Sequence, residues 1–359
     1  MTGQRAIRLG PEAPFRRLVG VGGIGTGMFL ALEGNRTLGR NESRPARLLD
    51  VQDYAKLHIV AHHVAVLLGA TPSGSPFHVV PVGRVGEDEA GRHLIAEMAA
   101  AGMDTSQVEA IEGPPTLFSF CFQYPDGSGG NVTTSHSAAA RLTAEDVERI
   151  APRINRQTVA LAAPEVGLEP RRRLLELATE RGAFRVASLT PTDVAEARET
   201  GLLGLVDLLA LNEDEAMILA GTKFVPDAPE PFLQALAATL DAERSGVKVV
   251  VTAGSRGAFA FEDGRWSERR PPTVEVWSTA GAGDALLGGV LAALAAGVPL
   301  TVPNPYESTL STALDLGIAV AALSVTSRHT IHPDANLEAV LRFARQAGLA
   351  LRAPLSDVV

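Results

Sequence analysis

Residues 278–297 read STAGAGDALLGGVLAALAAG, and this stretch decides how the rest of the chain is interpreted. Gly281 and Gly283 let backbone amides converge on one point, and an apolar helix begins there with its positive end facing the same point. The arrangement predicts an anion hole suited to phosphate. Asp284 stands in the first helical turn, where it can accept a proton from a hydroxyl group that attacks phosphorus. Taken alone, the stretch has a competing interpretation as a glycine turn with an aspartate helix cap.

Two further segments place phosphate-binding chemistry at the ends of strands. Residues 249–257 read VVVTAGSRG, a buried strand that runs into a glycine-containing turn, and nucleotides bind at the carboxyl ends of parallel strands. Asn212 and Glu215 follow another apolar strand and open a helix. They put an amide and a carboxylate at the same sheet edge, which suits a hydrated Mg²⁺ ion and phosphates. An N-capped acidic helix start is the plainer interpretation of this pair.

The hydrophobic pattern predicts an α/β fold. Short apolar strands alternate with helical patterns, which indicates a doubly wound, mostly parallel sheet with helices on both faces. One of the expected helices covers residues 53–69 and ends in glycine. Residues 116–134 alternate as an antiparallel hairpin does and predict a small separate β-sheet, a lid. We expect this division of the chain: a loose arm at 1–17, a domain at 18–345 with lid segments near 34–50 and 113–135, and a tail at 346–359.

The composition excludes several classes of protein. With 46% hydrophobic and 20% charged residues, the 359-residue chain is typical of globular proteins and not of disordered ones. The net charge of −9 and the lack of a basic block argue against nucleic-acid binding. Cys121 is the single cysteine, which excludes an intramolecular disulfide and a multi-cysteine zinc site. Glycines and Pro299 interrupt the most apolar stretch, and the start has no apolar signal region, so we expect a cytoplasmic protein that does not enter a membrane.

Residues 20–25 read GVGGIG after a strand-like run, which is a formal match to the dinucleotide-binding pattern G-x-G-x-x-G. Only eight residues separate Gly25 from Gly34, too few for the crossover helix of such a unit. We therefore interpret these glycines as a strand end that approaches a ligand or another backbone, and an NAD-dependent dehydrogenase is disfavoured.

Together these motifs resemble those of the ribokinase-like, or PfkB-type, carbohydrate kinases, over roughly residues 18–345. Residues 82–91 (VGRVGEDEAG) match the family pattern V-G-x-V-G-x-D-x-x-G, and residues 278–284 match D-T-x-G-A-G-D except that Ser278 replaces the first Asp. The remaining two motifs are N-x-x-E at Asn212 and Glu215, and T-x-G-x-x-G at Thr252, Gly254 and Gly257. The family fold is a doubly wound sheet with a small β-lid.

The resemblance implies roles for the site residues. Asp284 would be the catalytic base, and Glu215 with Asn212 would act on Mg²⁺ through its water molecules. The groups that would stabilise the transferring phosphoryl are the backbone amides of Gly281, Ala282 and Gly283. The residues that would line the ATP site are Thr252, Gly254, Gly257 and Thr279.

The acceptor site departs from the family pattern. Family members usually carry an Asp after the first strand that holds sugar hydroxyls, but the aligned stretch here is Gly25-Thr26-Gly27. They also carry a G-G-x-x-x-N segment where residues 53–58 read DYAKLH. The replacement of an Asp by Ser278 argues against potassium activation. The candidates for contact with the acceptor are Thr26, Gly27, Asn35, Arg36 and Lys56.

Several other side chains have two interpretations each. His58 and His62 are four residues apart on the expected helix and could bind a metal, but no third ligand is evident, so we favour satisfied or surface histidines. His329 and His332 lie in a late turn that either borders an adenine pocket or is a plain loop. The arginines that either close over an acidic acceptor or form a solvated lid edge are Arg36, Arg40, Arg44 and Arg47.

We therefore expect an ATP-dependent phosphotransferase that moves the γ-phosphoryl of MgATP to an alcohol group of a small carbohydrate-like acceptor. A nucleoside or another small alcohol is the alternative acceptor. A non-catalytic nucleotide- or metabolite-binding protein on the same fold is the alternative class. Exposed lid strands often find a partner edge, so a homodimer through the lid is the expected assembly.

Overall fold

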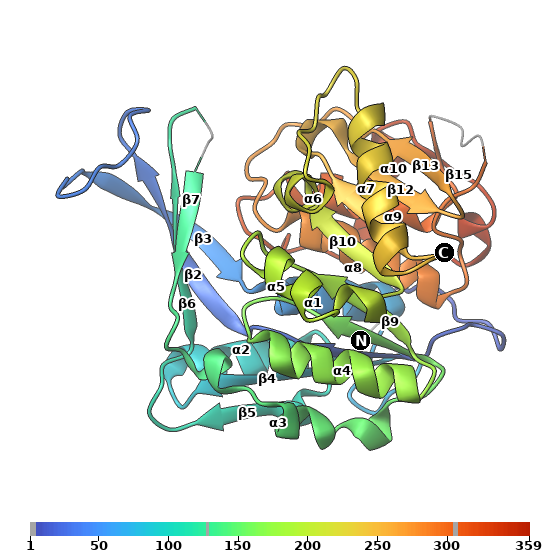
Figure 1. Ribbon diagram of the computed structural model, residues 1–359, viewed down its shortest axis with the longest axis horizontal. Helices are drawn as coiled ribbons and strands as arrows, with labels where there is room; N and C mark the ends of the chain where they lie inside the picture. The colour runs from blue at the N-terminus through green and yellow to red at the C-terminus, as the bar shows by residue number, and fades with distance from the viewer. Residues whose placement is uncertain (1–4, 127–128, 304–307) are drawn as a thin grey trace.

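One mostly parallel sheet forms the centre of the molecule (Figure 1). The computed structural model describes residues 5–126, 129–303 and 308–359, and within these ranges the sheet has nine strands. In spatial order they are β13 (Arg265–Arg269), β12 (Ala258–Glu262), β11 (Lys248–Thr252), β10 (Leu208–Asn212), β9 (Phe184–Ser188), β8 (Thr158–Ala162), β1 (Arg17–Val21), β4 (His78–Gly86) and β5 (Val108–Ile111). The strands from β11 to β5 in this order pair in parallel, whereas β12 and β13 add an antiparallel edge.

Helices cover both faces of this sheet. Val250 of β11 packs in an apolar cluster on one face, while its neighbours Val249 and Val251 pack in a second cluster on the other, because strand side chains alternate between faces. The helices on the first face are α1 (Lys56–Leu68), α2 (Glu89–Ala100), α8 (Ala282–Ala295), α9 (Ala313–Ser324) and α10 (Leu337–Gln346). Those on the second face are α3 (Ala144–Glu148), α4 (Leu168–Glu180), α5 (Asp193–Glu199), α6 (Glu213–Ala220) and α7 (Glu230–Glu243). The predicted doubly wound α/β architecture is confirmed.

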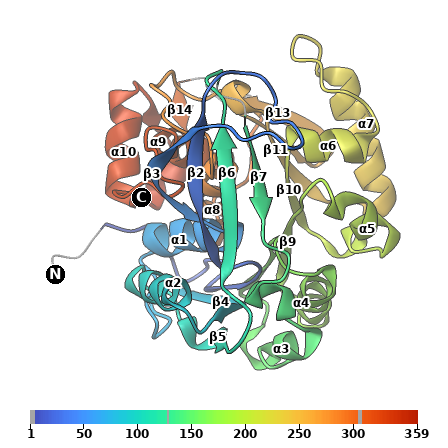
Figure 2. The ribbon, with the colours of Figure 1, turned by 90° about the vertical axis from the view of Figure 1, so that its left-hand side faces the viewer.

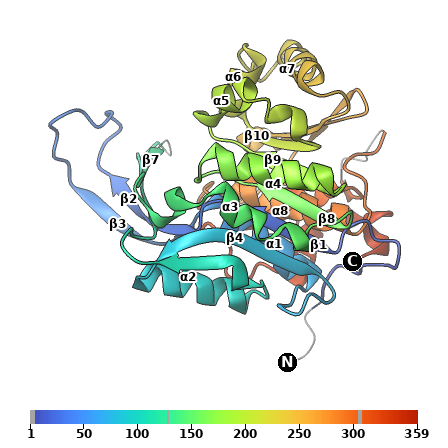
Figure 3. The same cartoon turned by 60° about the horizontal axis from the view of Figure 1, so that its bottom comes forward.

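A smaller sheet, the lid, stands beside the main body and is seen face-on in Figure 2. Its strands, in spatial order, are β3 (Ala46–Tyr54), β2 (Gly25–Leu32), β6 (Leu117–Gln123) and β7 (Gly129–Thr133). The first lid segment is longer than predicted, because β2 begins directly after residues 22–24 and its hairpin with β3 ends only at Tyr54. The loop between these two strands extends away from the body (Figure 3). Residues 127 and 128 of the predicted turn between β6 and β7 lie outside the described residues.

The helix that we expected over residues 53–69 begins later. Asp53 and Tyr54 are the last residues of β3, and α1 starts at Lys56. The spacing of apolar residues could not reveal this boundary, because the ladder pairs Asp53 with Gly27 of β2, a residue far away in the sequence. Gly69 ends the helix in the left-handed conformation, with φ of 61°, as a glycine C-cap does. The later start places Asp53 on the lid.

The first and last described segments of the chain pack against the body. Ile7 is buried, and its amide donates to the Leu67 carbonyl oxygen at 2.8 Å, so the described part of the segment that we expected as a loose arm is not loose. Residues 1–4 lie outside the described residues. The Arg8 amide donates to the Val358 carbonyl oxygen at 2.7 Å, which ties the first segment to the last. Two short strands, β14 (Thr309–Leu310) and β15 (Ala350–Leu351), pair in parallel and hold the tail.

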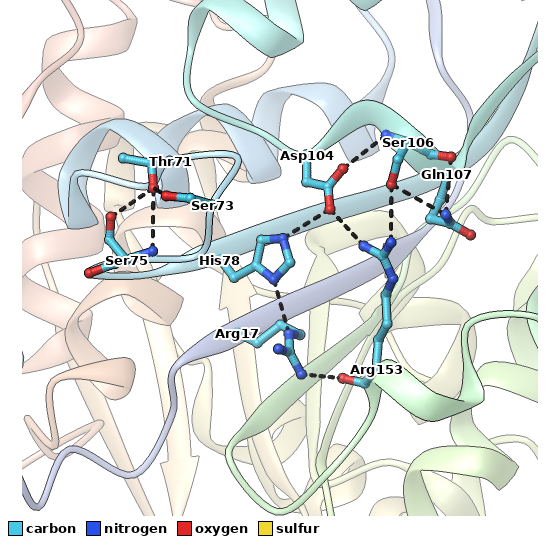
Figure 4. A network of polar contacts seen from close by, with 9 residues as sticks. All are labelled: Arg17, Thr71, Ser73, Ser75, His78, Asp104, Ser106, Gln107 and Arg153. Carbon is cyan, nitrogen blue, oxygen red and sulfur yellow. Dashed lines mark hydrogen bonds and ion pairs between the residues drawn. The ribbon is translucent and has the colours of Figure 1, made fainter.

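The amino-terminal ends of β1 and β4 carry a polar network (Figure 4). His78 Nε2 lies 3.0 Å from Asp104 Oδ2, and Arg153 donates to the same oxygen at 2.6 Å. Arg17 Nε donates to His78 Nδ1 at 3.2 Å. Burial alone would raise the pKa of Asp104, but hydrogen bonds from Ser106, Arg153 and His78 lower it to about 2. This network stabilises the edge of the sheet opposite to the carboxyl ends of the strands.

Among the helices in the described part of the chain, none combines the length and the apolar character that crossing a bilayer requires.

Candidate active site

The start of α8 is built as a tight backbone turn. Gly281 precedes the helix in the left-handed conformation, with φ of 76°, and a Cβ there would lie 2.7 Å from the Thr330 carbonyl oxygen, so only glycine fits. The Ala282 amide donates to the Thr279 carbonyl oxygen at 3.2 Å. The Gly281 and Gly283 amides are therefore the better placed of the three predicted donors to an anion at the helix N-terminus.

Two cavities meet at this turn. One has a volume of about 450 Å³, and the other has a volume of about 150 Å³. The turn residues that line the larger cavity are Thr279, Ala282 and Gly283. Those that line the smaller one are Ala280, Gly281 and Asp284. Ligands in the two cavities would therefore meet at the start of α8, beside the Asp284 carboxylate.

The turn after β11 forms one wall of the larger cavity. Thr252 is the last residue of that strand, and Gly254 and Gly257 take positive φ angles of 53° and 92°. A Cβ on Gly257 would overlap the carbonyl oxygen of Arg269, so the turn requires glycine there. All four predicted nucleotide-contacting residues of this region, Thr279 included, line this one cavity.

The opposite wall of the larger cavity is apolar. It is formed by Ile318, Ala321 and Ala322 of α9, together with Val325 and Val276. The sequence carried no motif for the three α9 residues, because they follow the same apolar helical pattern as the core positions of that helix. An apolar slot next to the turn that we predict to bind phosphate is suited to an aromatic ring such as a purine.

Asn212 and Glu215 are joined in a capping box at the start of α6. The Glu215 side chain accepts from the Asn212 amide at 2.8 Å and from Asn212 Nδ2 at 2.9 Å, while Asn212 Oδ1 accepts from the Glu215 amide. Glu215 is buried, and neither residue is among those that line the two cavities. Lys56 Nζ, 3.9 Å from Glu215 Oε1, links this pair to the smaller cavity.

The smaller cavity lies between the lid and the carboxyl ends of the central strands. Asp53 from β3, Lys56 from the start of α1 and Glu165 from the loop after β8 all line it. Glu165 has a φ of 71°, a conformation that residues other than glycine rarely adopt, and its Oε2 accepts from the Lys56 amide at 3.1 Å. Sequence reasoning missed Asp53 and Glu165 as site residues. The signal for Glu165 was its place directly after a buried parallel strand.

The carboxylates of this cavity hold their protons more tightly than usual. Burial raises the pKa of Asp53 and of Asp284 to about 6, and the charge of Asp284 adds to the shift at Asp53. Burial also raises the pKa of Glu165 to about 7, with further contributions from the charges of Asp284 and Asp53. Burial would lower the pKa of Lys56, but Asp284, Glu215 and Glu165 outweigh this and raise it. The cavity therefore carries an excess of carboxylate over cationic groups.

The predicted acceptor residues separate into two groups. Thr26 and Lys56 line the smaller cavity, and Gly27 lies beside it in the ladder opposite Asp53. Asn35 and Arg36 do not line it, because they belong to the outer loop between β2 and β3. There Asn35 Oδ1 accepts from the Asp126 amide at 3.0 Å, and Arg36 pairs with Glu42 at 2.7 Å.

The histidines and arginines for which the sequence left two interpretations mostly pack against, or bond to, neighbouring parts of the protein. His58 is buried and its ring packs on Tyr54 with the centroids 4.6 Å apart, and burial lowers its pKa to about 3. Within the described residues, no group of three or more His, Cys, Asp or Glu side chains could hold a metal ion. His329 Nδ1 accepts from the Gln52 amide at 2.9 Å, and neither it nor His332 lines the larger cavity. Arg44 pairs with Glu42, as Arg36 does, so these two arginines neutralise an acid of their own loop.

The chain is similar to one described family and to several known proteins. The family model described as "pfkB family carbohydrate kinase" matches residues 61–336. Ribokinase of Haemophilus influenzae is 24% identical over 244 residues, which are 68% of this chain and 74% of the relative. The 2-dehydro-3-deoxygluconokinase of Thermoproteus tenax is 27% identical over 286 residues, or 77% of this chain and 82% of that protein. The structure of Arabidopsis thaliana ribokinase with ribose and ATP has a TM-score of 0.67 at 20% identity, and the alignment covers 92% of this chain and 99% of that one.

Proposed function

Since the chain belongs to the pfkB family of carbohydrate kinases, we propose that it moves the γ-phosphoryl group of MgATP to a hydroxyl group of a small carbohydrate-like acceptor. The observation that carries this proposal is the position of Asp284 and the Gly281–Gly283 backbone where two cavities meet. A phosphoryl donor in the larger cavity and a hydroxyl acceptor in the smaller one would face each other there.

The larger cavity is the proposed ATP site. Its apolar wall on α9 suits the adenine ring, and the turn at Thr252, Gly254 and Gly257 leads the phosphates toward Thr279 and the start of α8. The positive end of α8 then faces the γ-phosphoryl group. This direction places the reacting phosphorus next to the smaller cavity.

The transfer step uses a base and backbone donors. As the acceptor oxygen forms its bond to the γ-phosphorus, the bond from that phosphorus to the bridging oxygen breaks, ADP leaves, and the hydroxyl proton passes to Asp284. The Gly281 and Gly283 amides donate hydrogen bonds to the equatorial oxygens of the γ-phosphoryl group. The Ala282 amide contributes by sharing its hydrogen between the Thr279 carbonyl oxygen and the phosphoryl group. Lys56 lies close enough to affect the pKa of Asp284 and adds a positive charge beside the reacting groups.

Asn212 and Glu215 line neither cavity, so we propose that they act on a hydrated Mg²⁺ ion only through its water molecules. Both oxygens of Glu215 already accept hydrogen bonds from Asn212, so the geometry suits an outer contact through water better than direct coordination. Mg²⁺ usually keeps several water ligands and binds substrate phosphates, where it neutralises charge on the leaving group. Ser278 Oγ accepts from the Ala280 amide at 3.2 Å, which supports the view that this position does not serve a monovalent cation.

The second copy of this chain is the proposed partner of the lid. Leu48, Phe120 and Val132 are 61%, 46% and 66% exposed, and the ladder register puts all three on the lid face turned away from the smaller cavity. Exposed apolar patches of this kind mark contact surfaces. Sedimentation of the wild-type protein should show a dimer, and the double variant Phe120→Lys, Val132→Lys should sediment as a monomer. A monomeric wild-type protein would contradict this part of the proposal.

The test of the function is ADP release from MgATP across a panel of sugars, sugar acids, phosphosugars, polyols and nucleosides. Asp284→Asn should lower kcat by roughly 10²–10⁴-fold, the usual contribution of a general base, while ATP affinity stays nearly unchanged. Asp214→Asn, an exposed acid at the start of α6, is the matched control and should leave kcat unchanged. Turnover that survives in Asp284→Asn would overturn the assignment of the base.

If ATP binds tightly and ADP is released with no acceptor in the panel, the results favour the alternative of a non-catalytic binding protein on this fold. The Asp284 carboxylate beside the helix N-terminus argues against that class, because an acid there weakens the binding of an anion unless it takes part in the reaction.

A further inference from the structure

The smaller cavity contains one carboxylate that comes from the lid, and neither the motifs nor the helix pattern predicted it. Asp53 ends the lid strand β3, whereas Glu165 and Asp284 come from the main body. Its residue is 9% exposed, and its side chain lines the cavity together with those two acids. The question is why the lid supplies a buried carboxylate at this point.

Asp53 reaches the cavity across the neighbouring lid strand. In the β2–β3 ladder it lies opposite Gly27, and a Cβ on Gly27 would overlap Asp53 Oδ2. The missing side chain at Gly27 therefore gives the carboxylate room to lie over β2. Thr26 Oγ1 donates to the Asp53 carbonyl oxygen at 2.9 Å, and Cys121 Sγ of β6 lies 3.9 Å from Oδ2. Thr26 thus fixes the backbone of Asp53, and Cys121 contacts its carboxylate.

Charged groups around the cavity are unbalanced. Three carboxylates line it, and Lys56 is the one Lys or Arg among the lining residues of the described chain. That Lys is also shared, since its Nζ lies 3.9 Å from Glu215 outside the cavity. Burial raises the pKa values of Asp53, Glu165 and Asp284, and the charge of Asp284 adds to the shift at Asp53 and at Glu165.

A ligand in this cavity has to be compatible with its excess of carboxylates. A carboxylate or phosphate on the acceptor would add a like charge to a buried site that has no second cation to pair with it. Hydroxyl groups, by contrast, donate hydrogen bonds, and ionised carboxylates accept up to about four each. The volume of about 150 Å³ admits one small acceptor at a time.

On the premise of the proposed kinase function, we propose that Asp53 is the acceptor-binding carboxylate of this site. It selects neutral polyhydroxylated acceptors over sugar acids and sugar phosphates. The lid strand β3 thereby supplies the acid that β2, with Gly25-Thr26-Gly27, lacks. Asp53 binds and orients the acceptor, and Asp284 remains the base.

The first test compares acceptors in pairs that differ by one charged group. D-ribose is paired with D-ribose 5-phosphate, and D-glucose with D-gluconate, in both ADP release and calorimetric binding in the presence of a non-hydrolysable ATP analogue. The neutral member of at least one pair should be preferred by roughly tenfold or more in kcat/KM or in Kd, the scale of one charge-assisted hydrogen bond. Preference for the anionic member of both pairs would overturn the proposal.

The second test uses two variants of the same strand. Asp53→Asn should raise the KM of the preferred neutral acceptor by roughly tenfold and narrow the preference over its anionic partner, while the KM of ATP stays unchanged. Asp50→Asn removes an exposed carboxylate of β3 and should change none of these constants. Equal acceptor constants for the two variants would overturn the role of Asp53. Thermal unfolding of both variants checks that each is folded.

The two kinds of failure are distinguishable. If no acceptor is phosphorylated, the proposed function fails, and the calorimetric comparison still decides the binding role of Asp53. If a sugar acid or sugar phosphate is phosphorylated best, the kinase function stands and the inference about Asp53 is wrong.

Discussion

The carbonyl oxygen of Thr330 lies 2.7 Å from the point that a Cβ on Gly281 would occupy. The same Thr330 is bound to the lid strand β3, since its amide donates to the Gln52 carbonyl oxygen at 3.1 Å and its hydroxyl accepts from the Tyr54 amide at 3.1 Å. One loop therefore contacts both the turn at the start of α8 and the strand end that carries Asp53. A displacement of this loop would disturb both halves of the site together.

Gly281→Ala tests this contact. The new Cβ meets Thr330 and the φ of 76° is unfavourable for alanine, so kcat should fall by roughly tenfold or more, a response expected when positioning is lost. Gly264 has the same φ of 76° in the β12–β13 hairpin and nothing near its Cβ position. Gly264→Ala is therefore the control, with a stability cost of about 1–2 kcal/mol and normal activity. Equal activity of the two variants would show that the Thr330 contact is unimportant.

The activity should depend on the ionisation of the cavity acids. Asp284 must be deprotonated to act as the base, and burial raises its pKa to about 6, while that of Glu165 rises to about 7. The value of kcat/KM should therefore increase as the pH rises from 5 through 7 and then level off. A profile measured from pH 5 to 9 at saturating MgATP checks this. A flat profile below pH 7 would mean that neither acid has to lose its proton in the free enzyme.

The network around Asp104 should stabilise the fold without affecting catalysis. Its folded pKa of about 2 lies below the unfolded value of about 3.9, so its contribution is complete above the unfolded pKa and is lost as the pH falls toward 2. Asp104→Asn should lower the free energy of unfolding at pH 7 by about 1–3 kcal/mol, and the difference from wild type should shrink below pH 4. Urea unfolding at both pH values measures it.

Asp241→Asn changes an exposed acid of α7 and is the control for that experiment. It should leave the free energy of unfolding unchanged. A loss of kinase activity in Asp104→Asn at a temperature where it is folded would contradict the separation of this network from the site.

Cys121 reports on the charge of Asp53. Burial raises the pKa of this thiol to about 12, and the carboxylate charge of Asp53 contributes next. Because the thiolate is the reactive form, iodoacetamide should modify wild-type Cys121 slowly at pH 8, and Asp53→Asn should speed the reaction by roughly threefold or more. The chain has a single cysteine, so the modified fraction is read directly from the intact mass. A rate in Asp53→Asn no faster than in Asp50→Asn would contradict a charged Asp53 next to the thiol.

Local sequence determined the half of the site that we propose binds phosphate. The turn at Gly281–Asp284, the turn at Thr252–Gly257 and the capping box of Asn212 and Glu215 are each formed by residues close together in the chain. Their conformations follow from glycine, from helix N-terminal chemistry and from the position of each segment after a strand. The alternation of strands and helices predicted the doubly wound sheet for the same reason. The spacing at which apolar residues recur in a strand or a helix is a property of neighbouring residues in the chain.

Only the tertiary structure decided the half of the site that we propose binds the acceptor. Asp53 belongs to the cavity because the register of β3 places it opposite Gly27, and the predicted helix over 53–69 had hidden that strand end. Glu165 lines the smaller cavity beside Lys56, which lies 109 residues earlier in the chain, and α9 lines the larger cavity beside the turn that follows β11. Such contacts depend on strand pairing and on how helices pack across the sheet. The spacing of residues along the chain does not contain that information, because many registers satisfy the same apolar pattern.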